Sequence, residues 1–204
     1  SYAWARDQVG GLLSQFKGQQ LGSLAIHLTE ISPEEELGAL VGLDIAAYNF
    51  RQIYQGQKAE LPQVSLHNLS NKAVLVESRA RASSVNLARH LVNLPPNDLN
   101  PTTYAELAQK GLKLSKSVKV TVWNQAKLKA EGMGLHLSVG LGSPNGACMV
   151  HLRYRPTKKS KLKPIAIVGK GITFDTGGLD IKPSSAMRLM KKDMGGSAAV
   201  LALT

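Results

Sequence analysis

The 204-residue chain contains a single cysteine, Cys148, so no disulfide bond can form within it. A chain without internal disulfides suits a reducing compartment, and we expect a cytoplasmic location. No apolar run approaches the roughly 20 residues that a membrane-spanning helix requires. No secretory signal pattern opens the sequence either. We therefore expect no membrane association.

Several common catalytic and phosphate-binding motifs are also missing. A G-x-x-x-x-G-K phosphate loop ending at Lys170 would need glycine at position 164, which is Pro164. A dinucleotide-binding G-x-G-x-x-G motif starting at Gly169 would need glycine at position 174, which is Phe174. Neither a G-x-S-x-G nucleophile elbow nor an H-E-x-x-H zinc motif occurs. These absences argue against the nucleotide-binding and hydrolase classes that such motifs define.

Acidic residues are few, 14 against 25 lysines and arginines, and the formal net charge is +11. Such a charge favours contact with nucleic acid through phosphate neutralisation. Lys158, Lys159, Lys161 and Lys163 form the densest basic run, but no aromatic side chains interleave to stack on bases. A solvated loop is the simpler interpretation of this run. Nucleic-acid binding therefore stays an alternative that is not favoured.

The N-terminal part of the chain alternates strand-like and helix-like patterns. Residues 24–28 alternate as a strand, and Val64 and Leu66 indicate another. Between them, Ser32-Pro33 followed by Glu35 is typical of a capping box that opens a helix, which we expect to end at Gly56. This alternation predicts a small α/β unit.

The C-terminal part continues the alternation. Residues 73–92 have the pattern of a long helix, whereas residues 118–122, 147–154 and 164–169 read as strands. A further helical stripe is predicted from Met187, Met190, Met194 and Leu201, with Asp193 on its border. The expected fold class of the whole chain is α/β.

Two lysines and two aspartates lie close together in sequence after the last predicted strand. They are Lys170, Asp175, Lys182 and Asp193, separated by glycine-rich turns. Charged groups beside a buried strand are costly unless they are paired or bind a metal ion. Judged from the residues alone, a salt-bridge network and a metal site are about equally favoured, because carboxylates without histidine are a weak metal signal.

The geometry of a strand constrains two of these side chains. Lys170 and Asp175 are an odd number of residues apart, so they would point to opposite faces of a regular strand. They converge only if the chain bulges or leaves the sheet between them, which Gly171 permits. Gly177 and Gly178 likewise allow a sharp turn.

These segments resemble the signature of a known family. VGKGITFDTGGLDIKP, from Val168, and MKKDMGG, from Met190, are similar to the signature of the leucyl aminopeptidase family, the two-metal cytosolic aminopeptidases. NLPPN at residues 93–97, GMG at 132–134 and VGLGS at 139–143 resemble earlier landmarks of that family. The resemblance covers residues 70–204 and departs mildly at Thr176, where the family usually has serine.

The resemblance implies a domain organisation. We expect a truncated N-terminal α/β domain at residues 1–69, a linker helix at 70–92, and the first part of a mixed-sheet α/β/α catalytic domain at 93–204. The family's remaining metal ligands and its catalytic arginine belong to a later N-T-D-A-E-G-R segment, which this sequence does not reach. We therefore expect the catalytic domain to be incomplete and the chain alone to be inactive.

The resemblance also implies roles for single residues. Lys170 would bind a metal ion through a neutral amine, Asp175 would bridge two metal ions, and Asp193 would complete one of the two sites. Lys182 would polarise the substrate carbonyl and stabilise the developing oxyanion. Met190 would line the pocket for the first substrate side chain, and Lys182 would also count as substrate-binding through its contact with the reacting carbonyl.

The implied function of the complete protein is that of a metal-dependent aminopeptidase. It would release N-terminal apolar, leucine-like residues from peptides with water activated by two divalent metal ions, Zn²⁺ and/or Mn²⁺. The resemblance also implies a homohexamer. The alternative from a different class is a basic DNA-binding or architectural protein.

Overall fold

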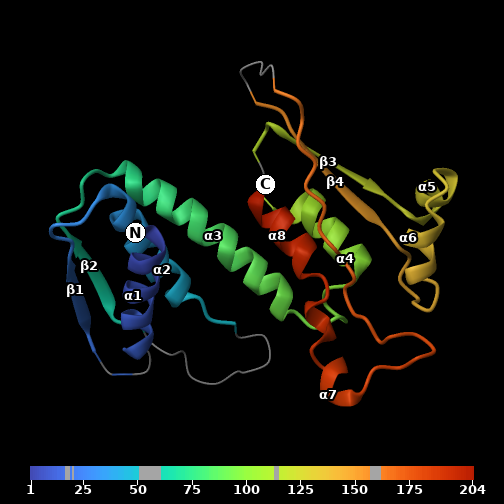
Figure 1. Ribbon diagram of the computed structural model, residues 1–204, viewed down its shortest axis with the longest axis horizontal. Helices are drawn as coiled ribbons and strands as arrows, with labels where there is room; N and C mark the ends of the chain where they lie inside the picture. Colours follow the sequence, from blue (N-terminus) through green and yellow to red (C-terminus); the bar gives the residue numbers. More distant parts are fainter. Residues whose placement is uncertain (17–18, 20, 51–60, 113–114, 157–161) are drawn as a thin grey trace. The chain divides into compact units, whose positions relative to one another are not determined.

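The computed structural model describes residues 1–16, 19, 21–50, 61–112, 115–156 and 162–204 (Figure 1). The chain divides into two compact units, Ser1–Leu87 and Ala88–Thr204. The division falls within the helix α3 (Ala73–Asn93), close to where the sequence predicts a linker helix. The mixture of helices with small parallel and antiparallel sheets confirms the α/β class.

In its described residues, the first unit contains a two-stranded parallel sheet and two helices before α3. Strand β1 (Ser23–His27) pairs with β2 (Gln63–His67), with His27 opposite His67. Parallel strands need a long connection, and α2 (Pro33–Ala47) lies in it, whereas α1 (Tyr2–Gln15) precedes β1. In both strands alternate side chains are half-buried, which is the pattern of a sheet covered on one face.

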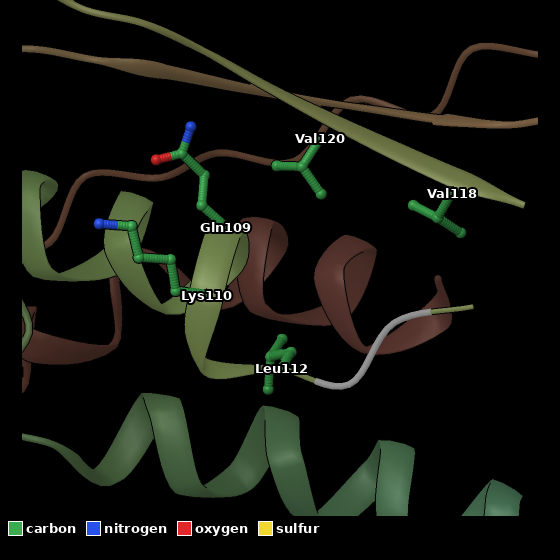
Figure 2. Close-up of a pocket in the computed structure, with 5 residues that line it drawn as sticks. All are labelled: Gln109, Lys110, Leu112, Val118 and Val120. Carbon is green, nitrogen blue, oxygen red and sulfur yellow. The ribbon is translucent and has the colours of Figure 1, made fainter. Parts of the chain in front are cut away.

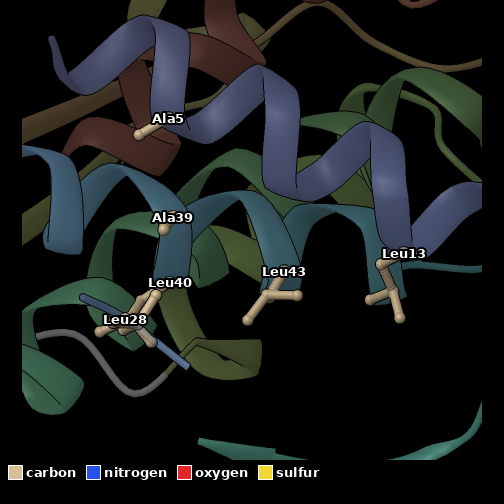
Figure 3. Close-up of a cluster of buried hydrophobic side chains, with 6 residues drawn as sticks. All are labelled: Ala5, Leu13, Leu28, Ala39, Leu40 and Leu43. Atoms are coloured by element: carbon tan, nitrogen blue, oxygen red, sulfur yellow. The ribbon is translucent and has the colours of Figure 1, made fainter. Parts of the chain in front are cut away.

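The helices α1 and α2 of this unit pack closely because glycines face the neighbouring backbone. A Cβ atom added to Gly38 or Gly42 would overlap the carbonyl oxygen of Tyr2 or Arg6. The buried core beside this contact consists of small and aliphatic residues (Figure 3): Ala5, Leu13, Leu28, Ala39, Leu40 and Leu43. Close approach of the two helices therefore depends on the absence of side chains at two positions.

The predicted capping box is confirmed at the start of α2. The backbone N–H of Glu35 donates to the Ser32 hydroxyl at 3.3 Å, and the Ser32 N–H donates to a Glu35 carboxylate oxygen at 3.0 Å. The end of this helix was predicted wrongly, because α2 stops at Ala47 and Gly56 lies outside the described residues.

The second unit holds an antiparallel strand pair and a set of short helices. Strand β3 (Val118–Trp123) pairs with β4 (Met149–Tyr154), with Val118 opposite Tyr154. The two strands agree with the predicted ones to within two residues. The remaining elements of this unit are α4 (Pro101–Glu106), the π-helix η1 (Leu107–Gly111), α5 (Gln125–Ala130), α6 (Gly134–Val139), α7 (Ser184–Met187), the 3₁₀ helix η2 (Met190–Lys192) and α8 (Gly195–Leu203).

Two sequence expectations are wrong in this unit. Residues 164–169 do not form a strand, because no backbone partner pairs with them among the described residues, and Ile165 and Val168 are 88% and 93% exposed. The helix expected across residues 187–201 is broken into α7, η2 and α8. Met194 and Leu201 are nonetheless buried, so part of the predicted apolar stripe does face the interior.

An open cavity of about 470 Å³ lies between η1 and β3 (Figure 2), lined by Gln109, Lys110, Leu112, Val118 and Val120. None of the residues predicted to bind metal or substrate lines it. Among the described helices, none has the length and apolar character to cross a membrane.

Candidate metal centre

A backbone contact joins the segment around Lys170 to the beginning of α8. The Ser197 N–H donates to the Lys170 carbonyl at 2.7 Å, and a Cβ added to Gly196 would lie 2.8 Å from the Lys170 nitrogen. A Cβ on Gly169 would in turn overlap the Gly196 carbonyl. Asp193 lies just before α8, so this glycine-to-glycine contact places Lys170 beside Asp193.

The first charged pair of the site is Lys170 with Asp193. The Lys170 Nζ lies 3.2 Å from Asp193 Oδ2, with the aspartate side chain largely covered and the lysine side chain about half exposed. The Oδ2 atom is itself buried and has no hydrogen-bond partner among the described residues. The lysine therefore neutralises the carboxylate by proximity without the alignment of a hydrogen bond, and one buried oxygen keeps a free acceptor site.

Asp175 is held by a turn that it caps itself. Its Oδ1 accepts a hydrogen bond from the Gly177 N–H at 2.8 Å. Gly177 and Gly178 have φ angles of +94° and +86°, which glycine adopts readily and other residues rarely do. The Lys182 N–H then donates to the Thr176 carbonyl at 2.9 Å, which returns the chain toward Asp175. The sharp turn expected from the two glycines is confirmed.

The second charged pair is Lys182 with Asp175. The Lys182 Nζ lies 3.1 Å from Asp175 Oδ2, and the two side chains are 32% and 28% exposed. The Gly177 N–H bond, followed by the Lys182 ammonium and the more distant charge of Lys170, holds the pKa of the Asp175 carboxyl below its usual value. Asp175 is therefore ionised at neutral pH, which is the form that binds metal ions.

The structure thus brings all four predicted charged residues into one electrostatic cluster, arranged as two ion pairs. Met190 lies in η2, is half-buried, and accepts a backbone hydrogen bond from Asp193 at 3.2 Å. No described cavity is lined by Met190, so its role in a substrate pocket stays a prediction. The assignment of metal ligands also stays a prediction.

The side-chain donors of this cluster have the chemistry that a divalent cation requires. In the described part of the chain, no group of three or more His, Cys, Asp or Glu side chains is placed to hold a metal ion. Asp175 and Asp193 supply carboxylate oxygens, however, and Lys170 can supply an amine nitrogen. Oxygen and nitrogen donors suit Mn²⁺ and Zn²⁺. The buried Asp193 oxygen without a hydrogen bond is the strongest structural sign of such a site.

Sequence reasoning missed the residues that hold the site together. Besides Gly169, Gly196 and Ser197, these include Lys191, whose Nζ donates to the Asn93 carbonyl at 3.0 Å and ties η2 to the end of α3. A basic side chain near a helix C-terminus is favourable. No local pattern could reveal this partner, because the two residues are far apart in sequence.

Sequence comparison places the second unit in a known family. The profile of the cytosol aminopeptidase family, catalytic domain, matches residues 86–204. Probable cytosol aminopeptidases of Bdellovibrio bacteriovorus and Leifsonia xyli subsp. xyli are 39% and 38% identical to the chain, over 96% and 97% of its length and 41% and 40% of theirs. The cytosol aminopeptidase of Sus scrofa is 33% identical over 89% of this chain and 35% of its own.

Solved structures agree with this placement. The cytosol aminopeptidase of Coxiella burnetii has a TM-score of 0.79 and 28% identity, covering 100% of this chain and 42% of its own. The bottromycin maturation enzyme BotP in complex with Mn has a TM-score of 0.81 and 27% identity, covering 99% and 43%. The chain therefore spans only about two fifths of the length of these relatives. By the match over more than half of its residues, the chain belongs to the cytosol aminopeptidase family.

Proposed function

We propose that the complete protein is a metal-dependent aminopeptidase that releases apolar, leucine-like residues from the N-termini of peptides. The observation that carries this proposal is the cluster of Lys170, Asp175, Lys182 and Asp193, within the segment that matches the family's catalytic domain. The names of the relatives support the reaction class. Family membership and site chemistry thus point to the same activity.

Asp175, Asp193 and Lys170 would hold the divalent metal ions, which we propose to be two, Zn²⁺ and/or Mn²⁺. The similar structure of BotP in complex with Mn supports this choice of cation. When bound, the metal ions supply an activated water and polarise the substrate carbonyl. Lys170 would bind through its amine, so it gives up a proton on metal binding.

Lys182 provides a positive charge next to the proposed bridging carboxylate. Its ammonium can donate hydrogen bonds to the substrate carbonyl oxygen and stabilise negative charge that develops there. Met190, with a flexible thioether, would contact the apolar side chain of the N-terminal residue. These two residues would orient the substrate relative to the metal ligands.

The proposal extends to the assembly and location of the complete protein, a cytoplasmic homohexamer that acts on peptides. The names of the relatives support the location. The net charge of +11 favours the alternative, DNA binding, as a second candidate function. A titration of DNA binding against salt would detect it, because phosphate contacts give a steep dependence on salt concentration.

The direct test is hydrolysis of a leucine anilide by the complete protein with added Mn²⁺ or Zn²⁺. We expect metal-dependent release that a chelator abolishes and that Asp175→Asn reduces by at least about tenfold, because a ligand charge is lost while the Gly177 hydrogen bond can still form. Hydrolysis that persists after metal removal, or its absence with metal present, would overturn the proposal.

A further inference from the structure

The position of Lys182 relative to Asp175 is built into the turn between them. The Lys182 N–H is held by the Thr176 carbonyl at 2.9 Å, and its side-chain stem passes over Gly177, where an added Cβ would lie 3.2 Å from Lys182 Cγ. The ammonium then reaches Asp175 Oδ2 at 3.1 Å. Backbone and side-chain contacts together direct the lysine to this carboxylate.

Both oxygens of Asp175 are engaged in this arrangement. Oδ1 accepts the Gly177 N–H, and Oδ2 faces the Lys182 ammonium. Asp193 differs, because its buried Oδ2 has an ion-pair neighbour but no hydrogen bond from any described residue. Each carboxylate therefore already faces a lysine, but Lys170 is itself a proposed metal ligand whereas Lys182 is not, so a metal ion at Asp175 must replace the Lys182 ammonium.

We propose that Lys182 is an internal cation that competes with the divalent metal for Asp175. Metal binding to Asp175 displaces the Lys182 ammonium from Oδ2, and the displaced ammonium becomes available to the substrate carbonyl. This inference rests on the proposed metallo-aminopeptidase function and adds to it a coupling between metal binding at Asp175 and release of Lys182. Lys182 reaches the substrate only when a metal ion is bound to Asp175. The ammonium that stabilises charge on the substrate is therefore available only in the metal-bound protein.

The test measures the affinity of the complete protein for Mn²⁺ by isothermal titration, without any substrate. Lys182→Gln removes the competing charge, so its Kd for Mn²⁺ should fall roughly threefold to tenfold below that of the wild type. Lys182→Arg keeps a cation that pairs well with carboxylates, so its Kd should stay within about twofold of the wild type. Lys192→Gln is the matched control, since it removes one charge from an exposed lysine beside Asp193 and should also stay within about twofold.

Equal or weaker Mn²⁺ binding by Lys182→Gln, with clear binding by the wild type, would overturn the competition while leaving the proposed function intact. Absence of Mn²⁺ binding in every variant and in the wild type would instead overturn the metal site and the competition with it. If Lys182→Gln fails to fold by circular dichroism, Lys182→Met carries the same expectation, because it also removes the charge and keeps the stem over Gly177.

Discussion

At the scale of single residues, the two aspartates and the two lysines of this site have different environments. The Asp175 carboxylate is hydrogen-bonded by its own turn and paired with Lys182. Asp193 lies just before α8, and among the described residues its buried Oδ2 has no hydrogen-bond partner. Lys170 and Lys182 each face one of these carboxylates. The proposed roles, one lysine as ligand and the other as charge stabiliser, depend on this difference in partners.

Replacing Lys182 with alanine should show whether this lysine stabilises charge on the substrate or binds a metal ion. In the complete protein at saturating metal, we expect Lys182→Ala to lower kcat by about 10²-fold or more, because one stabiliser of the developing oxyanion is lost. The amount of bound metal, measured by elemental analysis, should stay unchanged, and Lys192→Ala should change neither quantity. Loss of metal from Lys182→Ala would show that Lys182 is a ligand.

Cys148 should react slowly. Its thiol donates to the Pro101 carbonyl at 3.2 Å, and burial raises its pKa above the ordinary value of 9.0. At pH 8 we expect native Cys148 to react with an aromatic disulfide reagent at least about tenfold more slowly than the urea-unfolded chain. A native rate as fast as the unfolded one would show that the thiol is exposed.

The raised pKa of Cys148 also affects how the free energy of unfolding depends on pH. A group whose pKa is higher in the folded state favours folding below its ordinary pKa, and this contribution is lost as the pH rises through the folded value. The free energy of unfolding should therefore decrease above about pH 9 through Cys148. Cys148→Ala should lessen this decrease in urea denaturation measured from pH 7 to pH 10.

At the scale of elements, the site is assembled by the close contact of two glycines. Gly169 precedes Lys170, and Gly196 lies in the first turn of α8, so their contact fixes the distance between Lys170 and Asp193. The Ser197 N–H, one of the donors that a helix start leaves unpaired, is satisfied by the Lys170 carbonyl. The first turn of α8 and the loop that carries Lys170 thus stabilise each other.

Gly169→Ala should therefore disturb both stability and the site. The added methyl group overlaps the Gly196 backbone, which cannot rotate away as a side chain could. We expect a loss of about 1 to 3 kcal/mol in the free energy of unfolding by urea, together with weaker metal binding. Gly142→Ala is the control, because its Cβ meets no atom within 4 Å, and it should change stability by about 0.5 kcal/mol or less. Equal stability of the two variants would contradict the contact.

At the scale of the whole molecule, the chain spans about two fifths of its relatives, and its site has few donors. Three described residues, Lys170, Asp175 and Asp193, are expected to serve two metal ions, whereas zinc commonly takes four ligands. Apolar side chains of residues 162–168 are exposed as well. The described residues therefore offer fewer donors than the two proposed metal ions would take.

We accordingly expect the 204-residue chain, purified alone, to bind Zn²⁺ weakly and to show no hydrolysis of a leucine anilide. Its affinity for Zn²⁺ should rise with pH, because Lys170 must release a proton in order to bind. Titration calorimetry at two pH values beside a peptidase assay would check both expectations. Tight binding of two metal ions, or measurable turnover, would show that donors other than these three complete the site.

Much of the local structure could be read from the sequence. The capping box at Ser32, the strand pattern at 118–122 and the turn at Gly177-Gly178 depend on residues within a few positions of one another. The same is true of the family signature from Val168 to Gly196, which the family match confirms. These features follow from side-chain periodicity and backbone preference, which a short stretch of chain already contains.

Only the tertiary structure decided which charges meet. The sequence left a salt-bridge network and a metal site open, and the fold paired Lys170 with Asp193 and Lys182 with Asp175. It also broke the expected helix at 187–201 and left residues 164–169 without a strand partner in the described part of the chain. Strand pairing and ion pairing depend on groups that approach from distant parts of the chain, and their positions are determined by packing such as that of Gly169 on Gly196.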